Sequence, residues 1–117
     1  MNRQNFENLL RAVRECPAPD KFDMQTFGHP CGTPGCVLGQ YAARTDLQSV
    51  FKLTGAGNLE ACDGSRLWPG DELIAEHFGI TWMRALDIFG AAGCGNAQTR
   101  EQAVAYIEKF VKENSGD

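Results

Sequence analysis

The chain has 117 residues, of which 43% are hydrophobic and 22% charged, with a formal net charge of −4. This length suits a single core, so we expect residues 1–117 to form one globular domain, and the composition argues against global disorder. No cluster of Lys and Arg stands out. We therefore do not expect binding to nucleic acid or to an anionic membrane, because both depend on local positive potential.

The sequence shows no sign of a membrane or secretory segment. No stretch approaches the roughly 18 uninterrupted apolar residues that a membrane span needs, and residues 1–14 are polar and of mixed charge, unlike a signal peptide. The five cysteines are an odd number without the regular spacing of a secreted disulfide scaffold. We expect a cytoplasmic protein with reduced thiols.

An amphipathic helix is predicted over residues 3–15. Its apolar residues recur at offsets of three, four and seven, and Pro17 should end it. The apolar stripe consists of Phe6, Leu9, Leu10 and Val13. After a stiff connector, Phe22, Met24 and Phe27 are expected to pin an irregular segment against the core.

The CGTPGC sequence at residues 31–36 predicts the start of a helix. Thr33 suits the N-cap and Pro34 the first helical position, which puts Cys36 at the third. Free amides and the helix dipole there would favour a thiolate. The apolar side of this helix would be formed by Val37, Leu38, Tyr41 and Ala42, and Gly39 would permit a close backbone approach.

These residues also carry a resemblance. The FDM sequence at residues 22–24, the CGT at residues 31–33, then Cys36, Gly39 and Ala42 resemble a family of small, uncharacterised bacterial and phage-encoded proteins. Residues 75–89 and 99–110 are similar to further segments of that family. The chain departs from the pattern at Gln40, where the family usually has Trp. The resemblance implies a small accessory protein of phage or mobile-element type, and it implies no particular activity.

The middle of the chain predicts a β-hairpin and then two short helices. Residues 50–54 and 59–62 flank a Gly/Asn turn, and Leu67 and Trp68 are expected to enter the core, as is Trp82. Helices over residues 69–78 and 82–89 would be joined by a turn at Gly79, with Thr81 as the second N-cap. The pair, between residues 72 and 89, has the outline of a helix-turn-helix. Its second helix offers only Arg84 to a base and also carries Asp87, so we expect a buried corner rather than a DNA reader.

The last part of the chain predicts a flexible glycine-rich connector over residues 91–97 and a final helix. The connector lacks the preceding strand and the Lys-Ser/Thr of a phosphate-binding loop. Thr99 and Gln102 form a capping box, Glu108 and Lys112 a surface pair, and residues 114–117 should fray. The expected buried stripe consists of Ala103, Ile107, Phe110 and Val111. The fold class is therefore mainly α, with about five short helices and a small β-hairpin in one compact domain.

Three interpretations of the central cysteines remain open. In the first, Cys31 and Cys36 are small packing residues around a helix start. In the second, His29, Cys31 and Cys36 bind zinc, with a fourth ligand from Cys62, Cys94 or His77, although the usual spacing is missing. A disulfide between Cys31 and Cys36 is a related possibility.

In the third interpretation, Cys36 is a nucleophile with His29 or His77 as its base. Neither histidine lies at a recognised spacing, and His77 is expected at the surface or at a helix end. The sequence therefore favours a non-enzymatic protein that binds or regulates another protein in the cytoplasm, without a cofactor. The alternatives are a thiol-dependent enzyme or redox protein that uses Cys36, and a small zinc-binding module.

Overall fold

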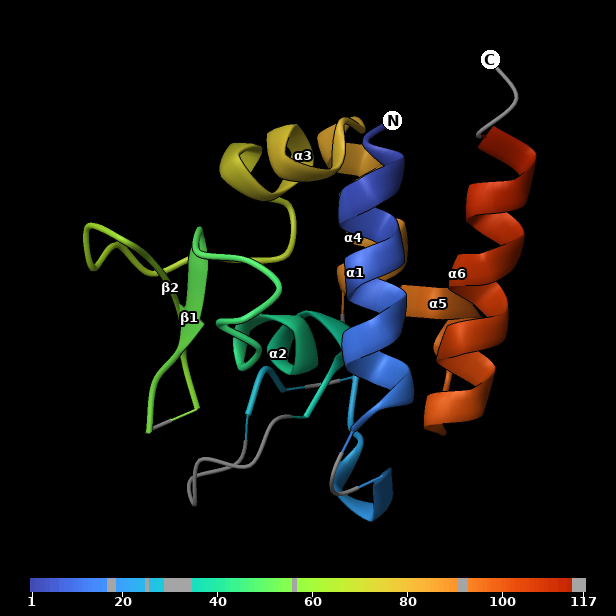
Figure 1. The fold of residues 1–117 in the computed structure, drawn as a ribbon, viewed down its shortest axis with the longest axis horizontal. Helices are drawn as coiled ribbons and strands as arrows, with labels where there is room; N and C mark the ends of the chain where they lie inside the picture. Colours follow the sequence, from blue (N-terminus) through green and yellow to red (C-terminus); the bar gives the residue numbers. More distant parts are fainter. Residues whose placement is uncertain (17–18, 25, 29–34, 56, 91–92, 115–117) are drawn as a thin grey trace.

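The computed structural model describes residues 1–16, 19–24, 26–28, 35–55, 57–90 and 93–114. These residues form a mainly helical fold with one small β-hairpin, as predicted (Figure 1). The elements in chain order are α1 (Arg3–Arg14), the short 3₁₀ turn η1 (Pro19–Lys21), α2 (Val37–Ala42), β1 (Phe51–Leu53), β2 (Leu59–Ala61), α3 (Glu72–Phe78), α4 (Trp82–Phe89), α5 (Gly93–Asn96) and α6 (Arg100–Asn114). None of the described helices combines the length and the apolar character that a membrane span requires.

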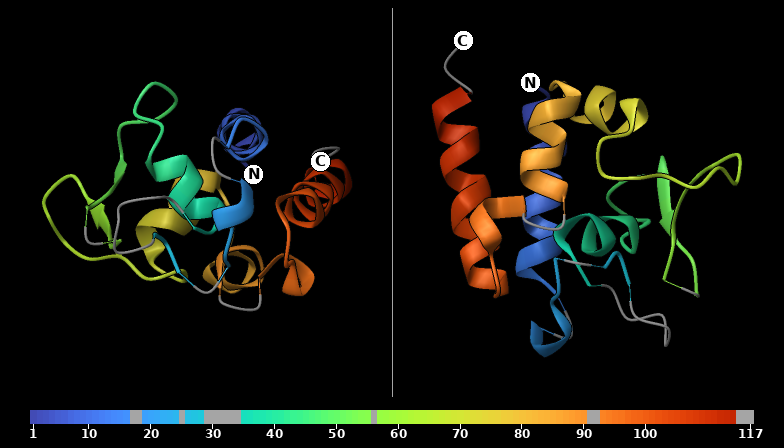
Figure 2. Two further views of the ribbon diagram at one scale, coloured as in Figure 1. Left: turned by 90° about the horizontal axis from the view of Figure 1, so that it is seen from below. Right: turned by 180° about the vertical axis from the view of Figure 1, so that it is seen from behind.

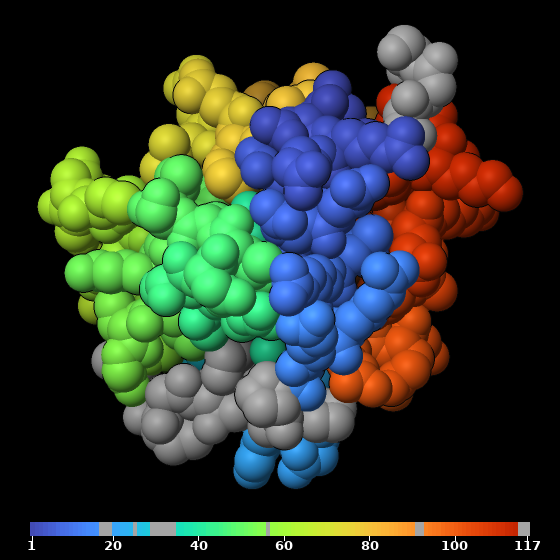
Figure 3. Space-filling model, viewed as in Figure 1, coloured from blue at the N-terminus to red at the C-terminus, as the bar shows by residue number. Residues whose placement is uncertain are grey.

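Helices α1 and α6 lie side by side and run antiparallel, on the opposite side of the molecule from the hairpin (Figures 1 and 2). The space-filling view shows α1 on the surface with α6 at one side of it (Figure 3). Phe6 of α1 is fully buried, and its ring centroid lies 5.5 Å from that of Phe110 in α6. Arg14 reaches across to Glu108 at 3.0 Å. Glu108 therefore forms its ion pair with α1. The pair that was predicted between Glu108 and Lys112 is not among the ion pairs of the described residues.

Helix α2 is the centre of the core, because all six of its residues are buried. It begins later than predicted. Cys36 has an extended backbone (φ −78°, ψ 176°) and is itself the N-cap, so it is not the third helical residue. Thr33 and Pro34 lie outside the described residues. The close approach predicted at Gly39 is confirmed, since a β-carbon there would overlap the carbonyl group of Phe27.

The hairpin is confirmed, and its strands are short. β1 and β2 pair antiparallel with Phe51 opposite Ala61 and Leu53 opposite Leu59. Phe51 and Leu59 are almost fully buried, so one face of the hairpin packs on the core.

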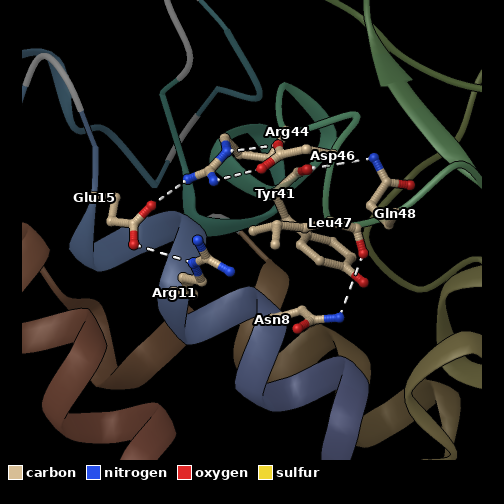
Figure 4. A network of polar contacts seen from close by, with 8 residues as sticks. All are labelled: Asn8, Arg11, Glu15, Tyr41, Arg44, Asp46, Leu47 and Gln48. Atoms are coloured by element: carbon tan, nitrogen blue, oxygen red, sulfur yellow. Dashed lines mark hydrogen bonds and ion pairs between the residues drawn. The ribbon is translucent and has the colours of Figure 1, made fainter.

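A polar network fastens the connection between α2 and β1 to α1 (Figure 4). Arg44 donates two hydrogen bonds to the carboxylate of Asp46, at 2.8 and 2.7 Å, and a third to Glu15 of α1 at 2.8 Å. Gln48 is buried, and its amide both donates to the carbonyl of Phe51 at 2.9 Å and accepts from the backbone N–H of Phe51 at 2.8 Å. These contacts give the turn a fixed conformation without regular secondary structure.

Helices α3 and α4 form the predicted corner. The side chain of Asp71 accepts from the backbone N–H of Leu73, so α3 begins at Glu72 and not at Pro69 as predicted. Gly79 ends α3 in the left-handed conformation (φ 65°, ψ 39°), which glycine adopts without strain. Thr81 caps α4, whose predicted bounds are confirmed.

The end of the chain differs from the prediction in two details. Residues 93–96 form the short helical element α5, where a flexible connector was predicted, and Cys94 in it has a φ of 53°. A β-carbon on Gly93 would overlap the carbonyl of Ile88, so this glycine allows the element to pack on α4. Asn114 belongs to α6 and does not fray, since its side chain donates to the carbonyl of Phe110 at 2.8 Å. The predicted stripe of α6 is buried.

Candidate functional site

Cys36 is a buried structural thiol in the described part of the chain. Its residue is 1% exposed, and its Sγ accepts a hydrogen bond from the backbone N–H of Gly39 at 3.4 Å. The thiol thus replaces the usual Ser or Thr oxygen as the cap of α2. It also forms part of the wall of a cleft of about 280 Å³ beside Phe27 and Phe89.

Burial dominates the chemistry of this thiol. Loss of solvation raises the pKa of Cys36 to about 11, with a further contribution from the negative charge of Asp23, although hydrogen bonds from the backbone N–H groups oppose the rise. The expectation of an easily formed thiolate is therefore wrong. Burial likewise raises the pKa of Cys94 to about 12. Neither thiol resembles the exposed, electropositive setting of a reactive cysteine.

The other residues proposed for zinc or catalysis are not assembled around Cys36. His29 and Cys31 lie outside the described residues, so the ligand set that includes them stays a prediction. Within the described part of the chain, no three His, Cys, Asp or Glu side chains are close enough to hold a metal ion. Cys36, Cys62 and Cys94 are free thiols.

His77 lies in the last turn of α3, as expected, but it also has an internal partner. Its Nε2 lies 2.7 Å from the hydroxyl of Tyr41, and its ring meets that of Phe51 edge-on at 4.9 Å. Burial lowers the pKa of His77, and the tautomer of the ring decides which of the two groups donates the hydrogen bond. Tyr41 is fully buried in α2. This pair links α2 to α3.

The largest departure from the sequence prediction concerns the two tryptophans. Trp68 and Trp82 were expected in the core, but they are 53% and 54% exposed. Both line an open groove of about 600 Å³ on the outer side of α3. We call this the tryptophan groove, and its main lining residues are Trp68, Glu72, Ala75, Glu76, Ile80 and Trp82.

Two of the four exposed large apolar side chains among the described residues line the tryptophan groove. Among the described residues, the large apolar side chains with high exposure are Trp68, Trp82, Met83 (62%) and Met1 (39%). Met83 follows Trp82 in α4, and Met1 packs beside Gly79, the residue that ends α3. Trp68 and Trp82 line the groove itself, whereas Met83 is adjacent to Trp82 in the chain and the backbone of Met1 lies beside the end of α3. Exposed apolar side chains gathered on one surface mark an interaction site, whereas scattered ones do not.

The groove also has a charged wall. Glu72 and Glu76 are exposed on successive turns of α3 and line the groove with the two tryptophans. Neither carboxylate forms an ion pair with another described residue. The groove thus combines aromatic surface with negative charge.

Sequence reasoning missed the groove because it assigned each tryptophan to the core in preference to an exposed interface. Gly70 permits the position of one of the rings. A β-carbon on Gly70 would overlap the ring of Trp68, so a residue without a side chain is needed where this ring approaches the backbone. In α4, Trp82 lies on the same side of the helix as Ala85 and Phe89, but it is the first helical residue and remains 54% exposed.

The comparisons with known proteins give no family for this chain. No family model, no curated protein and no solved structure matches it. The resemblance to small bacterial and phage-encoded proteins therefore stays a prediction from the motif.

Proposed function

We propose that this chain is a non-enzymatic accessory protein that binds another protein through the tryptophan groove. The observation that carries the proposal is the pair of tryptophans, each more than half exposed, on the same groove. Tryptophan is enriched at the centres of protein interfaces, where truncation of one such residue commonly costs about 2 kcal/mol or more of binding free energy.

The energetics of the free protein support this role. An exposed indole leaves a large apolar area in contact with water, and covering it on binding is favourable by roughly 25 cal/mol per Å². Few torsions are frozen when a tryptophan becomes part of an interface, so little of that gain is lost as entropy. Trp68 is further restrained because its ring lies on Gly70. The groove is thus a preformed docking surface.

The competing thiol-enzyme hypothesis has less support. A cysteine nucleophile requires an accessible thiolate and a base within hydrogen-bond reach. Cys36 is 1% exposed with a raised pKa, and His77 is occupied by Tyr41. The resemblance to small bacterial and phage-encoded accessory proteins fits protein binding in the cytoplasm better than catalysis.

The proposal is tested by capture and then by affinity. The immobilised wild-type chain is compared with the double variant Trp68→Ala/Trp82→Ala and with Lys109→Ala/Lys112→Ala, which alters α6 on another face. A protein retained by the wild type and by the lysine variant, but not by the tryptophan variant, is then purified and its Kd measured. We expect at least a hundredfold weaker Kd for the folded tryptophan variant. Equal affinity for all three chains would refute the proposal.

A further inference from the structure

We propose that the partner segment held in the tryptophan groove carries a Lys or Arg side chain between large apolar residues, and that this cation lies against Trp68 or Trp82 and pairs with Glu72 and Glu76. The inference rests on the proposed function, because it specifies the chemistry of the partner at the same groove. Four side chains carry it, and all four line one cavity.

The two glutamates of the groove differ from all others in the chain. The remaining glutamates each form an ion pair with Arg or Lys. They are Glu7, Glu15, Glu60, Glu101, Glu108 and Glu113. Glu72 and Glu76 are exposed to solvent and form no such pair with the described residues. The two glutamates that form no ion pair with the described residues therefore both line the tryptophan groove.

Two features of this arrangement are unfavourable for the isolated protein, although the helix dipole favours Glu72 in the first turn of α3. Glu72 and Glu76 are four residues apart on α3, where like charges repel. Glu76 also lies in the last turn of the helix, whose negative dipole end disfavours a carboxylate. His77 beside it is kept neutral by burial and gives no compensating charge. A cation from the partner would relieve both interactions.

The aromatic rings of the groove also favour a cation. The ring face of tryptophan attracts the cationic groups of Lys and Arg more strongly than the ring faces of tyrosine and phenylalanine do. The attraction increases when the cation loses its water. Glu72 and Glu76 line the same groove as the two indoles, so a cation bound there would interact with both kinds of side chain, and the apolar parts of the partner can cover Ile80 and Ala75. The groove therefore matches a segment that alternates basic and apolar residues.

The same features disfavour other occupants. In a symmetric dimer the same patch meets itself, so the four unpaired carboxylates of two copies would converge. A nucleic acid or an anionic membrane would bring further negative charge to Glu72 and Glu76. A basic segment of a different protein is the occupant that complements the charge.

The test uses the intrinsic fluorescence of the chain, because its only two tryptophans both line the groove. The probes are three 12-residue peptides that alternate Leu with Arg, Leu with Gln or Leu with Glu. We expect the Leu/Arg peptide to shift the emission and to bind at least tenfold more tightly than the other two. The variant Glu72→Gln/Glu76→Gln should weaken that binding at least fivefold. The control Glu7→Gln/Glu113→Gln changes the net charge equally, on α1 and α6, and should stay within twofold of the wild type.

Several outcomes would overturn the inference. Equal weakening by the control variant would mean that only overall charge matters, and equal affinity for the Leu/Gln peptide would mean that the groove is purely apolar. No emission change with any peptide up to 1 mM, or a wild-type dimer that Trp68→Ala dissociates, would also contradict it. If the captured partner loses affinity on the tryptophan substitutions and keeps it with Glu72→Gln/Glu76→Gln, the proposed function stands and this inference fails. If the tryptophan substitutions leave the partner's affinity unchanged, the proposed function itself fails.

Discussion

The indole ring of Trp68 lies on the backbone of Gly70, where a β-carbon would overlap it. A β-carbon at this position should displace the ring without unfolding the protein, because the overlapping atoms belong to the exposed Trp68 and the next atom, Cγ of Leu86, would lie 3.1 Å away. We predict that Gly70→Ala changes the tryptophan emission spectrum and alters the free energy of unfolding by less than about 1 kcal/mol. Fluorescence and urea denaturation on the same sample measure both. An unchanged spectrum would mean that Gly70 does not position the ring.

Gly39 should tolerate no side chain. A β-carbon there would meet the carbonyl group of Phe27, which is backbone and cannot move aside, within a fully buried helix. We predict that Gly39→Ala destabilises the protein by about 3 kcal/mol or more, as severe overpacking does. Gly55→Ala is the matched control, because a β-carbon at Gly55 would have no other atom within 4 Å. Similar urea midpoints for the two variants would contradict the packing of α2 against Phe27.

His77 should make stability depend on pH. Burial lowers its pKa below the ordinary 6.5, so as the pH falls through 6.5 the unfolded chain takes up a proton that the native protein does not. The free energy of unfolding should therefore fall between pH 7.5 and the native pKa. We predict that His77→Gln flattens this part of the curve in urea denaturation measured at half-unit intervals.

The variant Tyr41→Phe separates the hydrogen bond from burial. It removes the 2.7 Å contact with Nε2 of His77 and retains the aromatic packing. It should lower stability at pH 8 by roughly 1 kcal/mol and keep the pH dependence, since burial is its cause. If Tyr41→Phe abolished the pH dependence, the hydrogen bond and not burial would control the titration of His77.

The thiols should differ sharply in reactivity. Cys62 is exposed, whereas Cys36 and Cys94 are buried with raised pKa values. In a Cys31→Ser background at pH 8, we predict that a thiol reagent modifies Cys62 in the folded protein and reaches Cys36 and Cys94 only after urea is added. Mass spectrometry of digested samples identifies the modified site. Rapid modification of folded Cys36 would favour the thiol-enzyme hypothesis instead.

Local patterns in the sequence were sufficient for much of the fold. The stripe at Phe6, Leu9 and Val13 predicted α1, and Thr81 with Gly90 bounded α4, because capping residues and helical periodicity act over a few neighbours. The Gly/Asn turn predicted the hairpin for the same reason.

The remainder depended on contacts between distant segments, which periodicity does not contain. Cys36 is the N-cap of α2, whereas the sequence predicted it inside the helix. Residues 93–96 pack on α4 as a short helical element, whereas the sequence predicted a flexible connector. The groove requires Trp68 and Trp82, which are fourteen positions apart in the chain, to line the same surface of α3. The sequence also contains no sign that Glu72 and Glu76 lack the basic partners that the other glutamates have.

Site-specific photo-crosslinking tests the central claim most directly. A benzophenone amino acid replaces Met83, which follows the groove residue Trp82 in α4, in one chain and Lys109 on α6 in another, and each chain is irradiated in cells. We predict one dominant protein adduct from position 83, absent at position 109 and lost when Trp68→Ala is added. An adduct of equal yield from position 109, or one that persists in the Trp68→Ala chain, would show that the partner binds elsewhere on the molecule.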